Sequence, residues 1–143
     1  MTLENLLYEI SRLAIGQKII NYSAAGTDIY VLNGQTIKDW PVLFSSPTGT
    51  QYVKENSTVF TLTIYYLERM LSDLSNDVNV ISVSIEQLKN LINGIKQIQG
   101  VMNVEDEYEV VGFTETEAFN DSVAGAYATI KVEVANNTIC YVE

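Results

Sequence analysis

Apolar side chains recur along this chain with the period of an α-helix in two places, which predicts two amphipathic helices. The first covers about residues 2–16, with its apolar stripe at Leu3, Leu6, Leu7, Ile10, Leu13 and Ala14. The second covers about 79–99, with its stripe at Ile81, Ile85, Leu88, Ile92 and Ile95. Ser84 and Gln87 match a capping box, although the helix can begin several residues earlier, and Gly100 offers a stop.

Strict alternation of apolar and polar side chains predicts strands in the second half of the chain and in its middle. A central strand at about 58–68 has one face made of Phe60, Leu62, Ile64 and Tyr66. The last strand, at about 125–135, has a core face made of Ala126, Ala128, Ile130, Val132 and Val134. A further strand is expected at about 107–115.

Turn residues divide the segment between the first helix and the central strand. The Asn33-Gly34 pair is typical of a tight hairpin and predicts paired strands at about 28–32 and 35–44. Pro41 removes a ladder donor, and the run SSPTGT favours irregular backbone. We therefore expect an exposed loop at about 45–55.

This order of elements indicates the α+β class. The sequence predicts a mainly antiparallel, twisted sheet with two amphipathic helices packed on one face, and residues 1–143 form a single domain.

Charge and cysteine content restrict the partners and the compartment that we expect. Eight basic and eighteen acidic residues give a net charge of −10, which repels nucleic-acid phosphates and anionic membranes. We therefore expect neither sequence-specific DNA binding nor a membrane partner, and the N-terminal residues do not match a signal peptide. Cys140 is alone, so a disulfide within the chain is impossible and a reducing cytoplasm is expected.

The residue types that most often carry enzyme chemistry are missing from the sequence or stand outside a recognisable motif. The sequence has no histidine, so Cys140 lacks the usual base, and SSPTGT lacks the lysine of a phosphate-binding loop. The acids of EDEYE and ETE could bind a hard cation but lack the spacing of a calcium loop. We expect no catalytic residue, no metal site and no cofactor.

Several phrases, in this order, resemble the tail terminator (tail completion) and head-to-tail connector ring proteins of tailed bacteriophages. They are WPVLFSSPTGT, FTLTIYYLERMLSDLSN, ISVSIEQLKNLI and FTETEAFNDSVAGAYATIKVEV. The resemblance implies a non-enzymatic virion protein at the phage neck or tail, made in the bacterial host cytoplasm. It implies six or twelve copies in a ring, adjacent neck or tail proteins as partners, and DNA only as passing cargo.

A ring requires contacts between two different patches of neighbouring subunits, and exposed loops are the expected source of such patches. The loop SSPTGTQYVKEN and the segment FNDSVAG provide the candidates for an oligomer or docking surface, namely Pro47, Thr48, Gly49, Tyr52, Phe119, Asp121 and Gly125. Ordinary surface loops are the alternative.

Two other functions also remain open. One is a small acidic binding module of the inhibitor or immunity type for a basic partner. The other is a small enzyme or metal-dependent ligand binder that uses the EDEYE and ETE acids.

Overall fold

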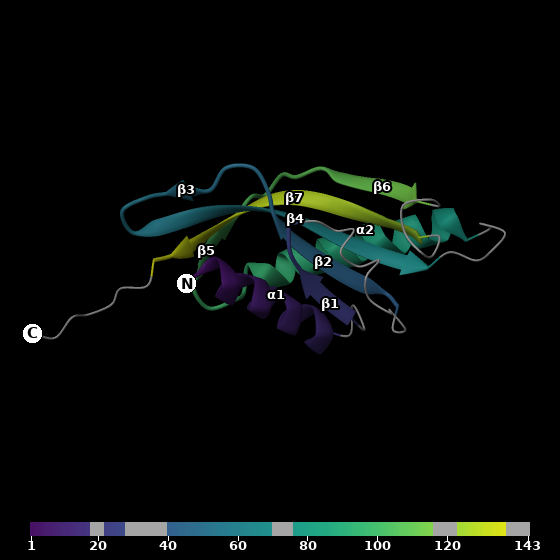
Figure 1. The fold of residues 1–143 in the computed structure, drawn as a ribbon, viewed down its shortest axis with the longest axis horizontal. Coiled ribbons are helices and arrows are strands. Elements are labelled where there is room, and N and C mark those ends of the chain that lie inside the picture. The colour runs from purple at the N-terminus through teal and green to yellow at the C-terminus, as the bar shows by residue number, and fades with distance from the viewer. Residues whose placement is uncertain (18–21, 28–39, 70–75, 116–122, 137–143) are drawn as a thin grey trace, which may run out of the picture.

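The computed structural model describes residues 1–17, 22–27, 40–69, 76–115 and 123–136. In these residues the chain forms an α+β domain in which two helices pack on a mixed, mostly antiparallel sheet of seven strands (Figure 1). The elements, in order, are α1 (Leu3–Gly16), β1 (Tyr22–Ala25), β2 (Val42–Pro47), β3 (Tyr52–Val53), β4 (Ser57–Arg69), α2 (Asp77–Ile95), β5 (Val101–Val104), β6 (Val110–Glu115) and β7 (Val123–Ala135).

Two long strands, β4 and β7, form the centre of the sheet. They pair antiparallel over their whole length, from Ser57 opposite Ala135 to Arg69 opposite Val123. On one side β2 pairs antiparallel with β4, and β1 adds to β2 in parallel; on the other side β5 and β6 pair with different halves of β7. The predicted antiparallel sheet is therefore confirmed, with one parallel pair at β1.

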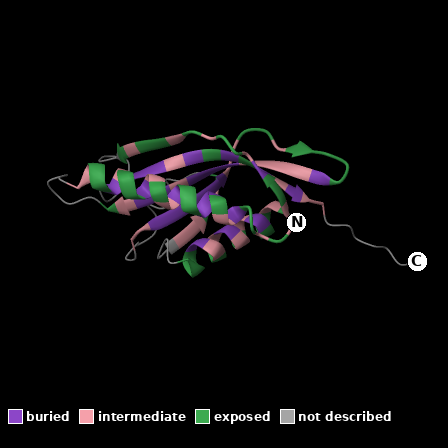
Figure 2. Ribbon diagram, turned by 180° about the vertical axis from the view of Figure 1, so that it is seen from behind, coloured by how far each residue is buried: buried purple, intermediate pink, exposed green. Residues whose placement is uncertain are grey.

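Both helices cover the same face of the sheet, as predicted. The expected stripe positions Leu6, Ile10, Leu88 and Ile92 are fully buried. They belong to one core cluster with Leu62, Ile64 and Tyr66 of β4 and the even-numbered residues 126–134 of β7. In β7 all five predicted core positions, from Ala126 to Val134, are buried. Figure 2 shows α2 lying along the sheet with its buried side turned inward and its exposed side outward.

The opposite face of the sheet carries a second, smaller core that the sequence patterns do not predict. Val42, Phe44, Leu67 and Val123 are all fully buried there. The Tyr65 ring lies beside Phe44, Phe113 and Tyr127, with centroid separations of 6.4, 6.5 and 5.4 Å. One half of the sheet is thus apolar on both faces. Along β4 and β7 the outer face then becomes polar, with Thr63, Thr61, Thr129 and Lys131.

Several predicted boundaries and elements are wrong. Of the strand predicted at 35–44, residues 35–39 lie outside the described residues. In the described part the strand begins only at Val42, after Pro41, and it continues to Pro47 because the small Ser45 and Ser46 fit its buried positions. β3 lies inside the segment predicted as a loop at 45–55, and the short strands β1 and β5 were not predicted. The predicted strand 107–115 begins only at Val110. The Asn33-Gly34 hairpin with its strand at 28–32 lies outside the described residues.

The second helix also differs from its prediction at both ends. It runs from Asp77 to Ile95 instead of 79–99. Ser84 lies inside the helix, where its hydroxyl donates a 2.6 Å hydrogen bond to the Val80 carbonyl, so it is not a cap. After Ile95 the backbone tightens into three-residue turns, and Gly100, with φ of +97°, leads into β5. The apolar repeat predicts which face is buried, but turn geometry decides where the helix ends.

Candidate functional site: the arm formed by β3 and β4

The hairpin that joins β2 to β4 extends beyond both helices at one end of the sheet (Figure 1). We call residues 48–61 the arm. Between β2 and β3 the strand is interrupted at Gly49, where φ is +64°. The Gln51 side chain replaces the missing ladder bonds, since its Oε1 accepts from Thr61 N at 2.7 Å and its Nε2 donates to Thr48 O at 3.3 Å. The arm therefore remains attached to β4 where regular pairing stops.

Threonine hydroxyl groups link the base of the arm to the sheet. The Thr48 Oγ1 lies 2.9 Å from the Thr63 Oγ1, which lies 3.0 Å from the Thr129 Oγ1 in β7. Farther out, Thr61 Oγ1 donates to Thr50 O at 3.1 Å. These contacts cross three adjacent segments, so the base of the arm is held by the sheet and does not move as a free loop.

The end of the arm exposes apolar side chains in two directions. Tyr52 and Val53 are adjacent in β3 and have 62% and 73% of their surface exposed. Because successive residues of a strand point to opposite faces, neither face of the arm is covered here. Tyr52 also lines a hollow of about 520 Å³ on the outer face of the sheet, together with Thr50, Val59, Thr61 and Lys131.

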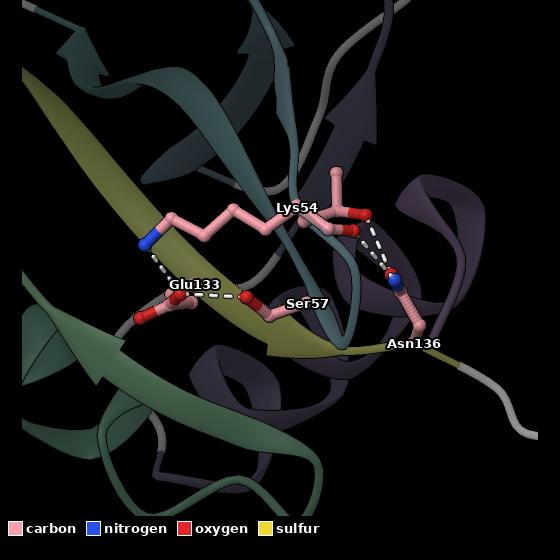
Figure 3. A network of polar contacts seen from close by, with 5 residues as sticks. Lys54, Ser57, Glu133 and Asn136 are labelled. Atoms are coloured by element: carbon pink, nitrogen blue, oxygen red, sulfur yellow. Dashed lines mark hydrogen bonds and ion pairs between the residues drawn. The ribbon is translucent and has the colours of Figure 1, made fainter.

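A carboxylate from β7 holds the tip of the arm. Glu133 Oε2 accepts a 2.7 Å hydrogen bond from the Ser57 hydroxyl and forms a 3.0 Å ion pair with the Lys54 ammonium (Figure 3). The Ser57 hydroxyl, and after it the Lys54 ammonium, hold the pKa of Glu133 below its ordinary value. Glu133 is thus a charged acceptor that joins the tip to the end of the central strand.

Asn136 makes a second set of contacts with the same tip. Its amide nitrogen donates to the Lys54 carbonyl oxygen at 3.2 Å (Figure 3). The same nitrogen donates to the Glu55 carbonyl oxygen at 3.2 Å, and the Asn136 Oδ1 accepts from the Thr58 hydroxyl at 2.7 Å. Its backbone N–H donates to Asn56 O at 3.0 Å. An isolated two-stranded ribbon is marginally stable in water, so these contacts with residues of β7 and beyond explain how an exposed arm keeps one conformation.

Asn136→Ala should loosen the arm without unfolding the domain. The substitution removes three side-chain hydrogen bonds, and we expect a loss of about 1–2 kcal/mol in the local opening free energy of the tip. Amide hydrogen exchange of residues 53–58 should accelerate while that of β7 is unchanged. Asn90→Ala, on the exposed side of α2, is the matched control. Equal protection of the tip in both variants would contradict the role of Asn136.

The contribution of Glu133 should depend on pH. Its pKa is lowered in the folded protein, so the unfolded chain takes up this proton first, near the ordinary value of 4.5. The stabilisation is therefore complete above that pH and is lost as the pH falls through the folded pKa. The difference in unfolding free energy between the wild type and Glu133→Gln, from urea titrations, should be larger at about pH 7 than at about pH 3. A constant difference would contradict this.

The structure places four of the seven predicted site residues together and a fifth elsewhere. Pro47 ends β2, and Thr48, Gly49 and Tyr52 belong to the arm, so these four lie together. Gly125 is buried in β7 opposite Leu67, whereas Tyr52 lies opposite Val59, eight residues away along β4. Gly125 therefore does not belong to the arm surface. Phe119 and Asp121 lie outside the described residues.

The acidic segment EDEYE forms a bulge between β5 and β6, beside β7. Glu105 and Asp106 face two lysines, with distances of 3.9 Å to Lys131 Nζ and 3.4 Å to Lys96 Nζ. Within residues 1–17, 22–27, 40–69, 76–115 and 123–136, no three acidic or cysteine side chains come close enough together to hold a metal ion. A charged bulge in an outer strand is a common way to discourage unwanted strand pairing, and this is the role that its position supports.

The residues that fix the arm, Lys54, Ser57, Glu133 and Asn136, were not identified from the sequence. Lys54 and Ser57 lie on the arm, and Glu133 and Asn136 lie at the end of β7 or just after it. The bonded residues are at least 76 positions apart in the sequence, the separation of Ser57 and Glu133. Alternation along the last strand places Glu133 on the face opposite the core positions Ala126 to Val134. Its partner could be found only from the register of β4 against β7.

Comparison with models of known protein families and with curated proteins finds no match. Neither α1 nor α2, the two helices in the described parts of the chain, has the length and apolar character needed to cross a lipid bilayer.

Proposed function

We propose that this chain is a non-enzymatic subunit of a homo-oligomeric ring at the neck or tail of a tailed bacteriophage, acting as a tail terminator or head-to-tail connector around the DNA channel. The arm is the observation that supports this proposal best. It is fixed by a polar network, yet its end exposes Tyr52 and Val53 to solvent. An ordered arm with uncovered apolar side chains suits docking to another protein surface.

The proposed mechanism depends on geometry alone. Each subunit contributes one patch to the neighbour before it and a different patch to the neighbour after it, and a fixed rotation between subunits closes the ring. The closed ring would present a platform to adjacent neck or tail proteins. A net charge of −10 suits a channel through which DNA passes without sticking.

The second candidate is an acidic binding module for a basic protein. The exposed side chains of Asp106, Glu107 and Glu109 favour it, because clustered acids accelerate association with a basic surface. This candidate predicts one-to-one binding with an association rate that falls steeply as salt is added.

Native mass is the experiment that separates the two candidates. Light scattering of the purified protein across a concentration series, with negative-stain imaging of large species, should give rings of six or twelve copies. A monomer at every concentration that also fails to associate with phage neck and tail proteins would end the ring proposal. Salt-sensitive, one-to-one capture of a basic protein by such a monomer would support the binding module.

A further inference from the structure

The described surface contains one apolar groove that is well separated from the arm. It lies between α1 and β1, has a volume of about 590 Å³, and is lined by Leu3, Glu4, Leu7, Tyr8, Ser11, Ser23, Ala24 and Ala25. Tyr8, at the edge of the groove, has 64% of its surface exposed. Like the arm, the groove presents apolar surface to water in the single chain.

The arm cannot reach the groove of its own chain. Ala25 pairs with Ser45, which pairs with Ile64 of β4, while Tyr52 pairs with Val59. The two sites are therefore five residues apart along β4, or about 17 Å at roughly 3.4 Å per residue. Glu133 and Asn136 also hold the tip of the arm at the far end of β7. Any contact between arm and groove must join two chains.

Each surface carries a charged side chain beside its apolar residues, an acid in the groove and a lysine in the arm, and the exposed Glu55 follows that lysine. Among the described residues that line the groove, Glu4 is the single charged one. Lys54 follows Tyr52 and Val53, and its side chain remains 48% exposed although it pairs with Glu133. Two copies with a net charge of −10 repel each other on average, so a stable contact between them needs a local basic group opposite an acid. The arm supplies such a group.

We infer that the arm of one copy docks into the groove between α1 and β1 of a second copy, with Tyr52 and Val53 on the apolar lining and Lys54 beside Glu4. The contact joins two different patches, so it repeats from copy to copy and supports a ring. This inference rests on the proposed function, because it names the interface through which the ring would close.

Disulfide cross-linking tests this arrangement directly. In a Cys140→Ser background, a chain carrying both Val53→Cys and Ala25→Cys should give, on oxidation, a ladder of covalent oligomers up to the size of the ring. A mixture of the two single variants should give only covalent dimers, and each single variant alone should give none. Cross-linking of a single variant with itself would instead indicate a two-fold contact and overturn the inference.

Surface variants test the same contact without new bonds. Tyr52→Ser with Val53→Ser should convert the assembled species to monomers at concentrations where the wild type is assembled. Val78→Ser, at an equally exposed position on α2, should leave the native mass unchanged. Glu4→Lys should weaken assembly, whereas Glu107→Lys, with the same change in net charge, should not. Circular dichroism and thermal unfolding check that every variant is folded.

The outcomes separate the inference from the proposal on which it rests. The wild type could form rings that also form with the Tyr52 and Val53 substitutions, while the double-cysteine chain gives no ladder of covalent oligomers. This result would overturn the arm-to-groove contact and leave the ring proposal standing. A wild-type protein that stays monomeric at every concentration would overturn the contact as well. Association of that monomer with phage neck or tail proteins would then decide the proposed function separately.

Discussion

Gly125→Ala should destabilise the protein by about 3 kcal/mol or more, enough to leave much of a domain of ordinary stability unfolded. A Cβ built at Gly125 would overlap the carbonyl oxygen of Tyr66 in the neighbouring strand. This obstacle is backbone, so a rotamer change cannot relieve it, and β4 and β7 would have to separate locally. Equilibrium unfolding in urea, followed by circular dichroism, measures the effect.

Gly16→Ala is the matched control for this substitution. No atom lies within 4 Å of a Cβ built at Gly16, the last residue of α1. Alanine favours helix over glycine, so we expect no loss or a gain of roughly 0.5–1 kcal/mol. Similar losses in both variants would show that Gly125 is not limited by contact with β4.

Phe44→Ala should cost about 3–5 kcal/mol, the second large effect that we expect. Phe44 is fully buried on the face of the sheet that the helices do not cover, where its ring stands against Tyr65 at 6.4 Å with an interplanar angle of 63°. Removing the ring leaves a cavity that the rigid central strands cannot fill. Thermal or urea unfolding, combined with the near-ultraviolet signal of the aromatic cluster, reports the loss.

Tyr52→Ala provides the control for the loss of an aromatic ring. Tyr52 is largely exposed in the arm, so the unfolding free energy should change by no more than about 0.5 kcal/mol. If Phe44→Ala were as mild as Tyr52→Ala, the outer face would not contain a second core. The pair of variants therefore tests a feature that we found only in the structure.

The candidate surface was predicted in part. The segment at about 45–55 was expected to be an exposed loop. Gly49 and Tyr52 are exposed, whereas Ser45 and Ser46 are buried in β2. Turn residues report local backbone preference, and that was sufficient to locate the interruption at Gly49. They do not report long-range pairing, so the prediction missed that Tyr52 and Val53 return to the sheet as β3. An expected surface loop is therefore a strand-paired arm.

Gly125 shows how the same residue can be selected for the wrong reason. The sequence analysis selects it as a docking candidate at the end of the segment FNDSVAG. In the structure it lies within β7, without a positive φ, at a close approach to β4. Close approach depends on the neighbouring strand, 58 positions away at Leu67, and no local pattern contains that information.

By itself, the sequence determined the elements whose side chains repeat with a regular period, and with them the α+β class. The stripes of α1 and α2 and the alternation in β4 and β7 identify the buried faces, because a helix or strand that forms must bury its apolar side. Only the tertiary structure decided the register of β4 against β7. That register brings Ser57 and Lys54 to Glu133 and places Gly125 against the backbone carbonyl of Tyr66. It also leaves the arm projecting from the sheet with its apolar end exposed. Contacts between residues more than fifty positions apart depend on how the whole sheet is assembled, and no single segment encodes them.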